Sequence, residues 1–239
     1  MKIYQRLAQV YEVGGWGKFA EQYIGLIDQL FIEYGIKQAR ILDVACGTGI
    51  LAVAFAKKGH SVYGIDISPE MIALARAKSS GIDNVSFDVQ NMTDFKVLGE
   101  FDLVTCTFDA LNYLITVEDL KAMFSCVSKS LRRSGLFIFD SNTNQHYISV
   151  GNRSEIHKIG TESFSQEVSY DPVWKKAKTI FKFADGAEEI HEQRPYDLSE
   201  LSPILDNAGL QVIKSLSWFD NRPYNQESKR LICVTQRNF

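Results

Sequence analysis

Short apolar runs alternate with helical segments between residues 38 and 142, and this alternation constrains the fold more than any other feature. The helical segments follow at 50–58, after Ser68-Pro69 and after Thr116, with Gly81 and Gly135 as the expected ends of the last two. Apolar strands that alternate with helices are typical of a parallel sheet covered on both faces. The predicted strands are ILDVA (41–45), SVYGIDI (61–67), VSFDV (85–89), FDLVTCTF (101–108) and LFIFD (136–140).

The segments on either side have a different pattern. Residues 1–37 are predicted to be mainly helical, because apolar residues from Tyr23 to Tyr34 recur at helical spacing. From 153 to 194, short runs alternate polar and apolar residues between turn signals, which predicts a small antiparallel sheet. A last helix, capped by Ser199 and ended by Gly209, is expected to lead into two strands over 210–219 and 230–236.

Composition excludes several classes of protein. With 45% hydrophobic and 23% charged residues, the chain is apolar enough to fold into a globular domain. A net charge of −3 lacks the basic character of a general nucleic-acid binder. The four cysteines and four histidines form no metal-ligand spacing, so we expect no metal site. No apolar run is long enough for a bilayer and no signal peptide is evident, so we expect a cytoplasmic protein without membrane partners.

The segment ILDVACGTGILA carries the clearest functional signal. A predicted strand runs into Gly47-Thr48-Gly49 and a helix follows, and glycines at such a turn let the backbone approach a ligand closely. Read as Gly47-x-Gly49-x-x-Ala52, the turn also fits the dinucleotide fingerprint G-x-G-x-x-G/A. The turn alone therefore leaves two classes of cofactor open.

Two carboxylates bear on that choice. Asp43 precedes Gly47 by four positions, where it would repel a pyrophosphate and suit a ligand that carries an ammonium and a sulfonium. Asp66 ends the second predicted strand and can accept both hydroxyls of a ribose, which either cofactor needs. The pair favours a cationic nucleoside over a nicotinamide dinucleotide.

The stretch ILDVACGTGILAVAFAKKGHSVYGIDISPEMIALARAK resembles the first half of a class I S-adenosylmethionine-dependent methyltransferase. The resemblance implies a Rossmann-like, mostly parallel seven-stranded sheet with helices on both faces and the last strand antiparallel. The cofactor-binding domain would span 38–142 and 196–239, after an N-terminal helical segment over 1–37. The stretch EEIHEQRPYDLSELSPILDNAGL is similar to small-molecule methyltransferases, including sugar N-methyltransferases, so 143–195 would be an inserted antiparallel β subdomain that forms a substrate lid.

The resemblance also implies roles for residues of the turn and of the second strand. The turn from Asp43 to Gly49 would hold the methionine part of S-adenosylmethionine, Asp66 would bind the ribose, and Ile67 would pack on the adenine. The turn residues in question are Asp43, Ala45, Cys46, Gly47 and Gly49.

Other expected cofactor contacts lie farther along the chain. Asn91 stands where the family often has an Asp; its amide oxygen can accept from the adenine amino group, with Asp88 as a rival, or it is a plain turn residue. The backbone of Met92 can meet an adenine ring nitrogen. Thr107, Phe108 and Asp109 are expected to face cofactor and substrate. Tyr11 and Trp16 either form a lid over the cofactor or pack an N-terminal helix on the sheet.

The predicted function is methyl transfer to a nitrogen or oxygen of a small molecule by in-line displacement, in a monomer or a homodimer. CTFDALNY lacks the Asp/Asn-Pro-Pro-aromatic stretch of nucleic-acid amino-methyltransferases, and no cysteine follows a proline, which argues against nucleic-acid substrates. An NAD(P)-dependent oxidoreductase, a silent cofactor-binding module and an aminopropyl transferase remain as alternatives.

A catalytic base is sought in EEIHEQ, where Glu189, His191 and Gln193 share one strand face opposite Ile190. If that face overlooks the active site, His191 is the general base; otherwise it is exposed to solvent. Tyr113 is a rival polar group. Residues 143–195 are expected to shape substrate choice and to leave cofactor binding intact.

Overall fold

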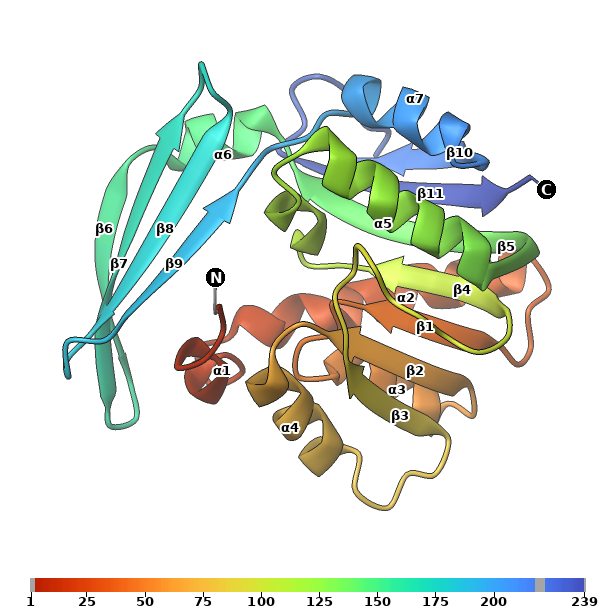
Figure 1. The fold of residues 1–239 in the computed structure, drawn as a ribbon, viewed down its shortest axis with the longest axis horizontal. Coiled ribbons are helices and arrows are strands. Elements are labelled where there is room, and N and C mark those ends of the chain that lie inside the picture. Colours follow the sequence, from red (N-terminus) through yellow and green to blue (C-terminus); the bar gives the residue numbers. More distant parts are fainter. Residues whose placement is uncertain (1–2, 218–221, 239) are drawn as a thin grey trace.

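The chain forms two separate sheets in a computed structural model that describes residues 3–217 and 222–238 (Figure 1). The larger sheet has seven strands in the order β10-β11-β5-β4-β1-β2-β3. The five strands from β5 to β3 in this order are parallel, and β11 pairs antiparallel with both β5 and β10, so the predicted sheet is confirmed. The strands are β1 Arg40–Val44, β2 Ser61–Asp66, β3 Val85–Val89, β4 Phe101–Cys106, β5 Leu131–Asn142, β10 Leu210–Leu216 and β11 Arg230–Arg237.

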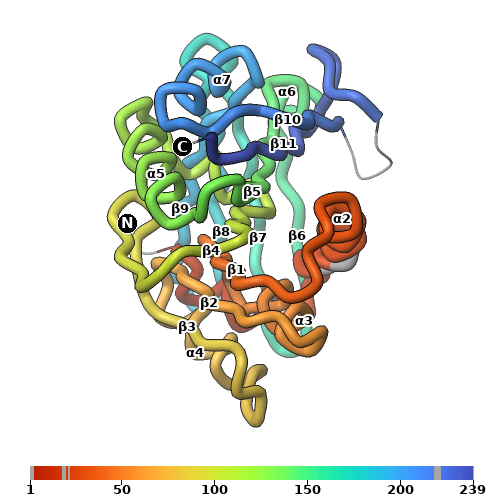
Figure 2. Tube along the Cα trace, turned by 90° about the vertical axis from the view of Figure 1, so that its right-hand side faces the viewer, coloured from red at the N-terminus to blue at the C-terminus, as the bar shows by residue number. Residues whose placement is uncertain are grey.

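Helices cover both faces of this sheet, and α2 and α5 lie on opposite sides of it (Figure 2). Alternate residues of each strand point to the two faces, so that Ile41 packs with α2, α3 and α4 while Leu42 packs with α5 and α7. Two apolar cores result, one on each face, as expected for a parallel sheet. The helices are α2 Ala20–Glu33, α3 Ile50–Lys57, α4 Pro69–Lys78, α5 Val117–Ser130 and α7 Leu198–Asn207.

The smaller sheet is an antiparallel meander that stands beside the C-terminal ends of the central strands (Figure 1). Helix α6 (Asn144–Val150) leads into it from β5. The N-terminal segment, with α1 (Leu7–Val10) and a 3₁₀ turn η1 (Trp16–Phe19), lies between the two sheets. It packs on the smaller sheet through a third apolar cluster that includes Leu7, Val10 and Phe181. The four strands are β6 Arg153–Ile159, β7 Glu162–Asp171, β8 Lys176–Phe183 and β9 Glu188–Gln193.

Several predicted boundaries were wrong. Helix α5 ends at Ser130, and Gly135 lies inside β5, where a Cβ would come within 3.1 Å of the Phe101 carbonyl oxygen. The N-cap of α7 is Asp197, not Ser199. The strand expected over 210–219 ends at Leu216, and residues 218 and 219 lie outside the described part.

The N-terminal helical segment is shorter than the sequence pattern predicts. The long helix starts only at Ala20, and the residues before it form short turns that contain three glycines, Gly14, Gly15 and Gly17. Across 3–217 and 222–238, none of the helices combines the length and apolarity that crossing a bilayer requires.

Candidate active site

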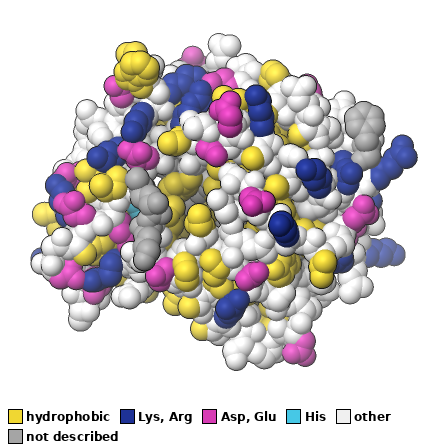
Figure 3. Space-filling model, viewed as in Figure 1, with side chains coloured by type: hydrophobic (Ala, Val, Ile, Leu, Met, Phe, Trp, Pro, Cys, Tyr) yellow, Lys and Arg dark blue, Asp and Glu magenta, His cyan; other side chains and the backbone are white. Residues whose placement is uncertain are grey.

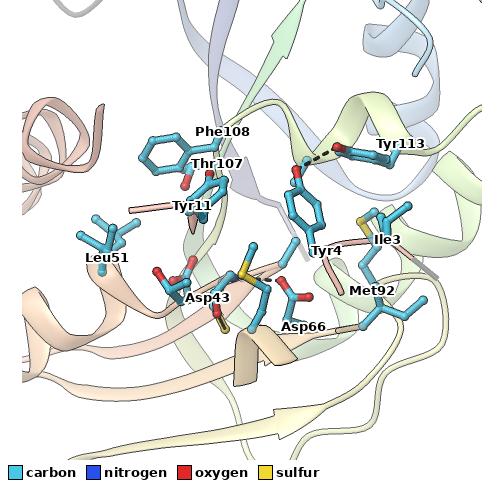
Figure 4. A pocket seen from close by; sticks show the side chains of 18 of the residues that line it. Ile3, Tyr4, Tyr11, Asp43, Leu51, Asp66, Met92, Thr107, Phe108 and Tyr113 are labelled. Carbon is cyan, nitrogen blue, oxygen red and sulfur yellow. Dashed lines mark hydrogen bonds between the residues drawn. The ribbon is translucent and has the colours of Figure 1, made fainter. Parts of the chain in front are cut away.

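A cavity opens at the C-terminal ends of β1, β2 and β4, where ligands bind in sheets of this type (Figure 4). It encloses about 920 Å³ of space free of atoms, its open mouth included. Apolar side chains dominate its wall. The lining residues that the sequence predicted are Tyr11, Asp43, Ala45, Cys46, Gly47, Asp66, Ile67, Asn91, Met92, Thr107, Phe108 and Tyr113.

The glycine turn after β1 has two glycines with different tasks. Gly47 has φ +53° and lines the cavity, and a Cβ there would meet nothing within 4 Å, so it would stand in the empty pocket. Gly49, with φ +73°, is not among the lining residues; its missing side chain makes room for Phe87. Of the two glycines only Gly47 lines the cavity, and a ligand contact of Gly49 stays a prediction.

Asp43 lies buried on the floor of the cavity. Its Oδ1 accepts a hydrogen bond from Thr105 Oγ1 at 2.7 Å, and no other side chain of the described residues neutralises it. Burial raises the pKa of Asp43 to about 7, against the lowering effect of the Thr105 hydroxyl and with a further rise from Asp66. A cationic ligand beside Asp43 would stabilise the ionised form of this carboxylate.

Asp66 stands beside it at the end of β2. Its two oxygens accept the backbone N–H groups of Gly47 and Ser68, each at 2.9 Å, so the carboxylate also holds the glycine turn in place. Burial raises the pKa of Asp66, while those two amides lower it. Among the described residues, no cationic side chain pairs with Asp43 or Asp66. The two carboxylates therefore fit a ligand that carries positive charge and hydroxyl donors.

The N-terminal segment covers the cavity from the side opposite these carboxylates. Figure 4 shows Tyr4 and Tyr11 across the cavity from Asp43 and Asp66. The hydroxyl of Tyr4 lies 2.8 Å from that of Tyr113, and Ser68 Oγ donates to the Tyr4 carbonyl oxygen at 3.3 Å. Of the two expected lid residues, Tyr11 therefore belongs to the wall.

Trp16 does not line the cavity. Its ring stacks on Tyr11, with centroids 6.1 Å apart, and on Phe164 of β7, with centroids 6.4 Å apart. Of the two roles expected for Trp16, these contacts favour packing, because the indole fills the space between the N-terminal segment and the smaller sheet. A cofactor contact of Trp16 stays a prediction.

Backbone strain concentrates around the cavity. Tyr4, Ala45, Phe108 and Asp109 have φ between +50° and +64°, which side chains other than glycine rarely adopt. Three of these four residues line the cavity, and Asp109 follows directly after the third. Strain of this kind persists where surrounding contacts impose it, and it gathers at ligand sites.

The side of the cavity expected for adenine is only partly as predicted. Ile67 lines it with about half of its side chain exposed. Asn91 lines it too, but its Oδ1 accepts from the backbone and hydroxyl of Thr93, both at 3.0 Å, which is a turn role. Asp88 is not among the lining residues, and its carboxylate accepts from Tyr63 and Gln90.

His191 is buried rather than exposed, and it reaches the cavity through Tyr113. Its Nδ1 lies 2.7 Å from the Tyr113 hydroxyl, which lines the pocket, whereas His191 itself does not. Its Nε2 has no hydrogen-bond partner among the described residues and faces Glu189 Oε2 at 3.5 Å. Burial raises the pKa of Tyr113 well above its usual value near 10, so the phenol is neutral.

A charged network joins the loop after β4 to both sheets. Arg230 of β11 pairs with Asp140 and, at 3.1 Å, with Asp109. Asp109 also accepts from Gln193 Nε2 of β9 at 3.0 Å. Burial raises the pKa of Asp140, although Arg230 lowers it. The network fixes the strained loop that carries Phe108 next to the pocket.

Sequence reasoning missed a second set of lining residues. The missed residues in α3 and α4 lie next to the glycine turn or across the pocket from it, so the glycine motif indicated the region in which they lie. Tyr4 gave no signal, because its position depends on residues more than a hundred positions away. The missed residues are Ile3, Tyr4, Gly17, Thr48, Ile50, Leu51, Met71, Gln90 and Ala110. In the described ranges, no three side chains of His, Cys, Asp or Glu come together as metal ligands.

Two comparisons of the sequence with known proteins both match methyltransferases. A family model described as a methyltransferase domain matches residues 41–135. A protein of Geobacillus sp. (strain WCH70) that bears a methyltransferase name is 30% identical over 248 residues, covering 98% of this chain and 96% of that protein.

Solved structures agree in fold over the full length. An S-adenosylmethionine-dependent methyltransferase from Clostridium acetobutylicum ATCC 824 has a TM-score of 0.83 and 25% identity, covering 99% of both chains. SAM-bound CalS10, an amino pentose methyltransferase from Micromonospora echinaspora involved in calicheamicin biosynthesis, has a TM-score of 0.73 and 22% identity. That match covers 100% of this chain and 99% of that one.

Proposed function

Because this chain belongs to the S-adenosylmethionine-dependent methyltransferases, we propose that it methylates a nitrogen or an oxygen of a small molecule. The cofactor supplies an electrophilic methyl group on a sulfonium. Membership of this family removes the alternative of a nicotinamide-dependent oxidoreductase. The observation that carries the proposal is the Tyr113 hydroxyl, which lines the cofactor cavity and touches a buried imidazole outside it.

The cofactor end of the cavity has donors and acceptors for each part of S-adenosylmethionine. Asp43 would hold the ammonium, Asp66 the ribose hydroxyls, and Ile67 with Met92 would pack on the adenine. Gly47 leaves the space that a Cβ would take from the ligand. Tyr4 and Tyr11 close this end from above and exclude water, which favours a reaction that disperses charge.

The acceptor end would lie at Tyr113. An acceptor O–H or N–H would give its proton to Tyr113 Oη as Tyr113 gives its own to His191 Nδ1. The deprotonated atom would take the methyl group as the S–CH3 bond of the sulfonium breaks, which leaves a neutral thioether. His191 becomes an imidazolium whose Nε2–H faces the Glu189 carboxylate at 3.5 Å. Because Tyr113 is a neutral phenol, it relays the proton and His191 holds it.

A small acceptor is supported by the enclosure of the site. The N-terminal segment lines the cavity through Ile3, Tyr4 and Tyr11, and the face of the molecule in Figure 3 is hollowed. That face carries acidic and basic side chains together, without the continuous basic surface that binds nucleic acid. The amino pentose methyltransferase of the same fold acts on a small molecule, which supports the same substrate class here.

The test is an acceptor screen with a methyl-labelled donor. Panels of small amines, amino sugars, phenols and alcohols are compared with RNA, DNA and unfolded protein. We expect label in at least one small-molecule panel and none in the polymers. Labelling of a polymer alone would overturn the proposed substrate class, whereas the class of product formed identifies nitrogen or oxygen as the acceptor.

A further inference from the structure

One carboxylate of the smaller sheet binds three backbone amides of the N-terminal segment. Glu189 of β9 is 4% exposed, and its Oε2 accepts the N–H of Tyr4 at 3.1 Å. Its Oε1 accepts the N–H of Arg6 and, at 3.2 Å, that of Leu7. Three amides within a span of four residues thus converge on a single buried side chain, which fixes the path of the backbone there.

Further contacts place the same segment on the inner face of the smaller sheet. The Arg6 guanidinium pairs with Asp185 and, at 3.1 Å, with Glu162. Leu7 packs in an apolar cluster with Phe164 and Phe181. These side-chain contacts hold the N-terminal segment against the smaller sheet, but none of them involves the backbone of Tyr4.

The opposite side of the segment faces the cofactor cavity. Ile3, Tyr4 and Tyr11 line it, and Tyr4 has the strained φ of +59°. Such a conformation needs external restraint. The Tyr4 N–H is held by Glu189, its carbonyl oxygen by Ser68 and its hydroxyl by Tyr113.

We infer that Glu189 is a positioning residue that controls how tightly and how long S-adenosylmethionine is held, by fastening the N-terminal segment over the cofactor cavity. The inference concerns cofactor retention and does not depend on the acceptor proposed above. It also changes the expectation that residues 143–195 leave cofactor binding intact, because Glu189 belongs to that stretch.

The ionised state of Glu189 suits this task. Burial raises the pKa of Glu189, but the adjacent His191 and the amides of Arg6 and Leu7 together lower it by more. The net shift of the pKa is therefore downward. A charged acceptor forms stronger hydrogen bonds to amides than a neutral one does. Without it, the amides of residues 4–7 gain hydrogen bonds only by leaving the sheet for water, which opens the cavity.

Glu189→Gln and Glu188→Gln form a matched pair for the test. Glu188 is the exposed neighbour on the other face of the same strand, so its variant controls for the lost charge. The dissociation constant and dissociation rate of S-adenosylhomocysteine are measured without any acceptor. We expect both to rise at least tenfold in Glu189→Gln and to change less than twofold in Glu188→Gln, with Glu189→Ala weaker still.

Two further measurements separate positioning from general destabilisation. Amide hydrogen exchange at residues 4, 6 and 7 should accelerate in Glu189→Gln while the strands of the larger sheet stay protected. Tyr4→Ala should weaken binding alone, and adding Glu189→Gln to it should weaken binding little more, because both act through one segment. Fully additive effects, or unchanged affinity in folded Glu189→Gln, would overturn the inference.

If Glu189→Gln does not fold, hydrogen exchange of the parent protein with and without ligand still tests the inference. S-adenosylhomocysteine should then slow hydrogen exchange at residues 4, 6 and 7 together with the glycine turn. If the ligand protects the glycine turn but leaves the exchange rates of these three amides unchanged, the segment does not close on the cofactor.

Discussion

The ring of Phe87 occupies the space behind Gly49, where a Cβ would lie 2.8 Å from its Cζ atom. Gly64 of β2 makes room for the same ring, since a Cβ there would approach Phe87 to 2.5 Å. Gly49, at the N-cap of α3, and Gly64, in β2, therefore both make room for one aromatic side chain beneath the turn. Gly47, two residues earlier, has nothing beside it but the cavity.

This difference predicts that two alanine substitutions differ in their balance between lost stability and lost affinity. Gly49→Ala should lower the free energy of unfolding by about 2–4 kcal/mol, since overpacking adds to the strain of a positive φ. Gly47→Ala should cost only about 1–2 kcal/mol of stability, from the strain alone. Denaturant unfolding with S-adenosylhomocysteine titration checks both, and Gly47→Ala should show the greater loss of affinity per unit of stability lost. Equal stability losses would contradict this assignment.

Asp66→Ala should weaken S-adenosylhomocysteine binding by about 1.5–3 kcal/mol, the range for hydrogen bonds to a charged group. The substitution removes the acceptor for ribose and frees the Gly47 and Ser68 amides that the carboxylate now holds. Calorimetry measures the loss, with Asp88→Ala as the control on the neighbouring strand. An unchanged dissociation constant in folded Asp66→Ala would mean that the ribose is bound elsewhere.

Asp43 should make cofactor affinity depend on pH. Its pKa of about 7 in the folded protein lies above the value near 4 expected when unfolded, so the folded state binds the proton more tightly. Ionisation therefore removes stability from the ligand-free protein as pH rises from about 4 to 7. A ligand ammonium prefers the ionised form, so affinity should fall below pH 7, by up to about tenfold per pH unit.

The isosteric variant Asp43→Asn checks this dependence. Its affinity for S-adenosylhomocysteine should be low at every pH and nearly flat between pH 5.5 and 7.5, with a weak residual slope from Asp66. Its unfolding free energy without ligand should exceed that of the parent at pH 7. A parent protein whose affinity does not change over this range would refute the role of Asp43.

The Tyr113–His191 pair should govern turnover and affect cofactor binding much less. His191→Ala is expected to reduce turnover about 100-fold, as loss of a general base does. Tyr113→Phe should give a similar loss, because it removes the hydroxyl that joins the acceptor to the imidazole. S-adenosylhomocysteine affinity should stay within a few-fold, and His157→Ala on β6 is the control. Turnover near the parent value in His191→Ala would mean that alignment alone suffices.

Arg230→Met should destabilise the protein by about 3–5 kcal/mol, because Asp140 is fully buried and loses its ionic partner. The neighbouring Lys229→Met, at an exposed position, should change stability by less than about 0.5 kcal/mol. Denaturant unfolding at pH 7 measures both. At pH 4 the deficit of Arg230→Met should shrink, since burial raises the pKa of Asp140 and favours its neutral form.

Much of the larger sheet was predictable from sequence because its signals are local. Apolar runs, a Ser68 cap whose side chain accepts the Met71 amide, and glycine stops define β1 to β4 and their helices without reference to distant residues. The same holds for the carboxylates at 43 and 66, which follow directly from their places at strand ends. Gly135 misled because a glycine ends a helix and relieves a crowded strand equally well.

The parts of the site that sequence did not yield depend on long-range pairing. Period-two alternation put Glu189 and His191 on one face, but it did not say which face is covered. The answer came from Tyr4 and Leu7, whose own segment has too few apolar repeats to predict its docking. Trp16 was ambiguous for the same reason, since an aromatic ring packs as well on a sheet as on a ligand.

The covering of the cavity by residues 3–11 has a consequence for the order in which the protein matures. This segment leaves the ribosome before either of its partners, since Glu189 is made 185 residues after Tyr4, and Tyr113 109 residues after it. During synthesis the glycine turn and its carboxylates are complete long before β9 exists, so the nascent chain has a cofactor site without a cover. Contacts of such sequence separation close late in folding. Tight retention of the methyl donor is therefore a property that only the finished chain acquires.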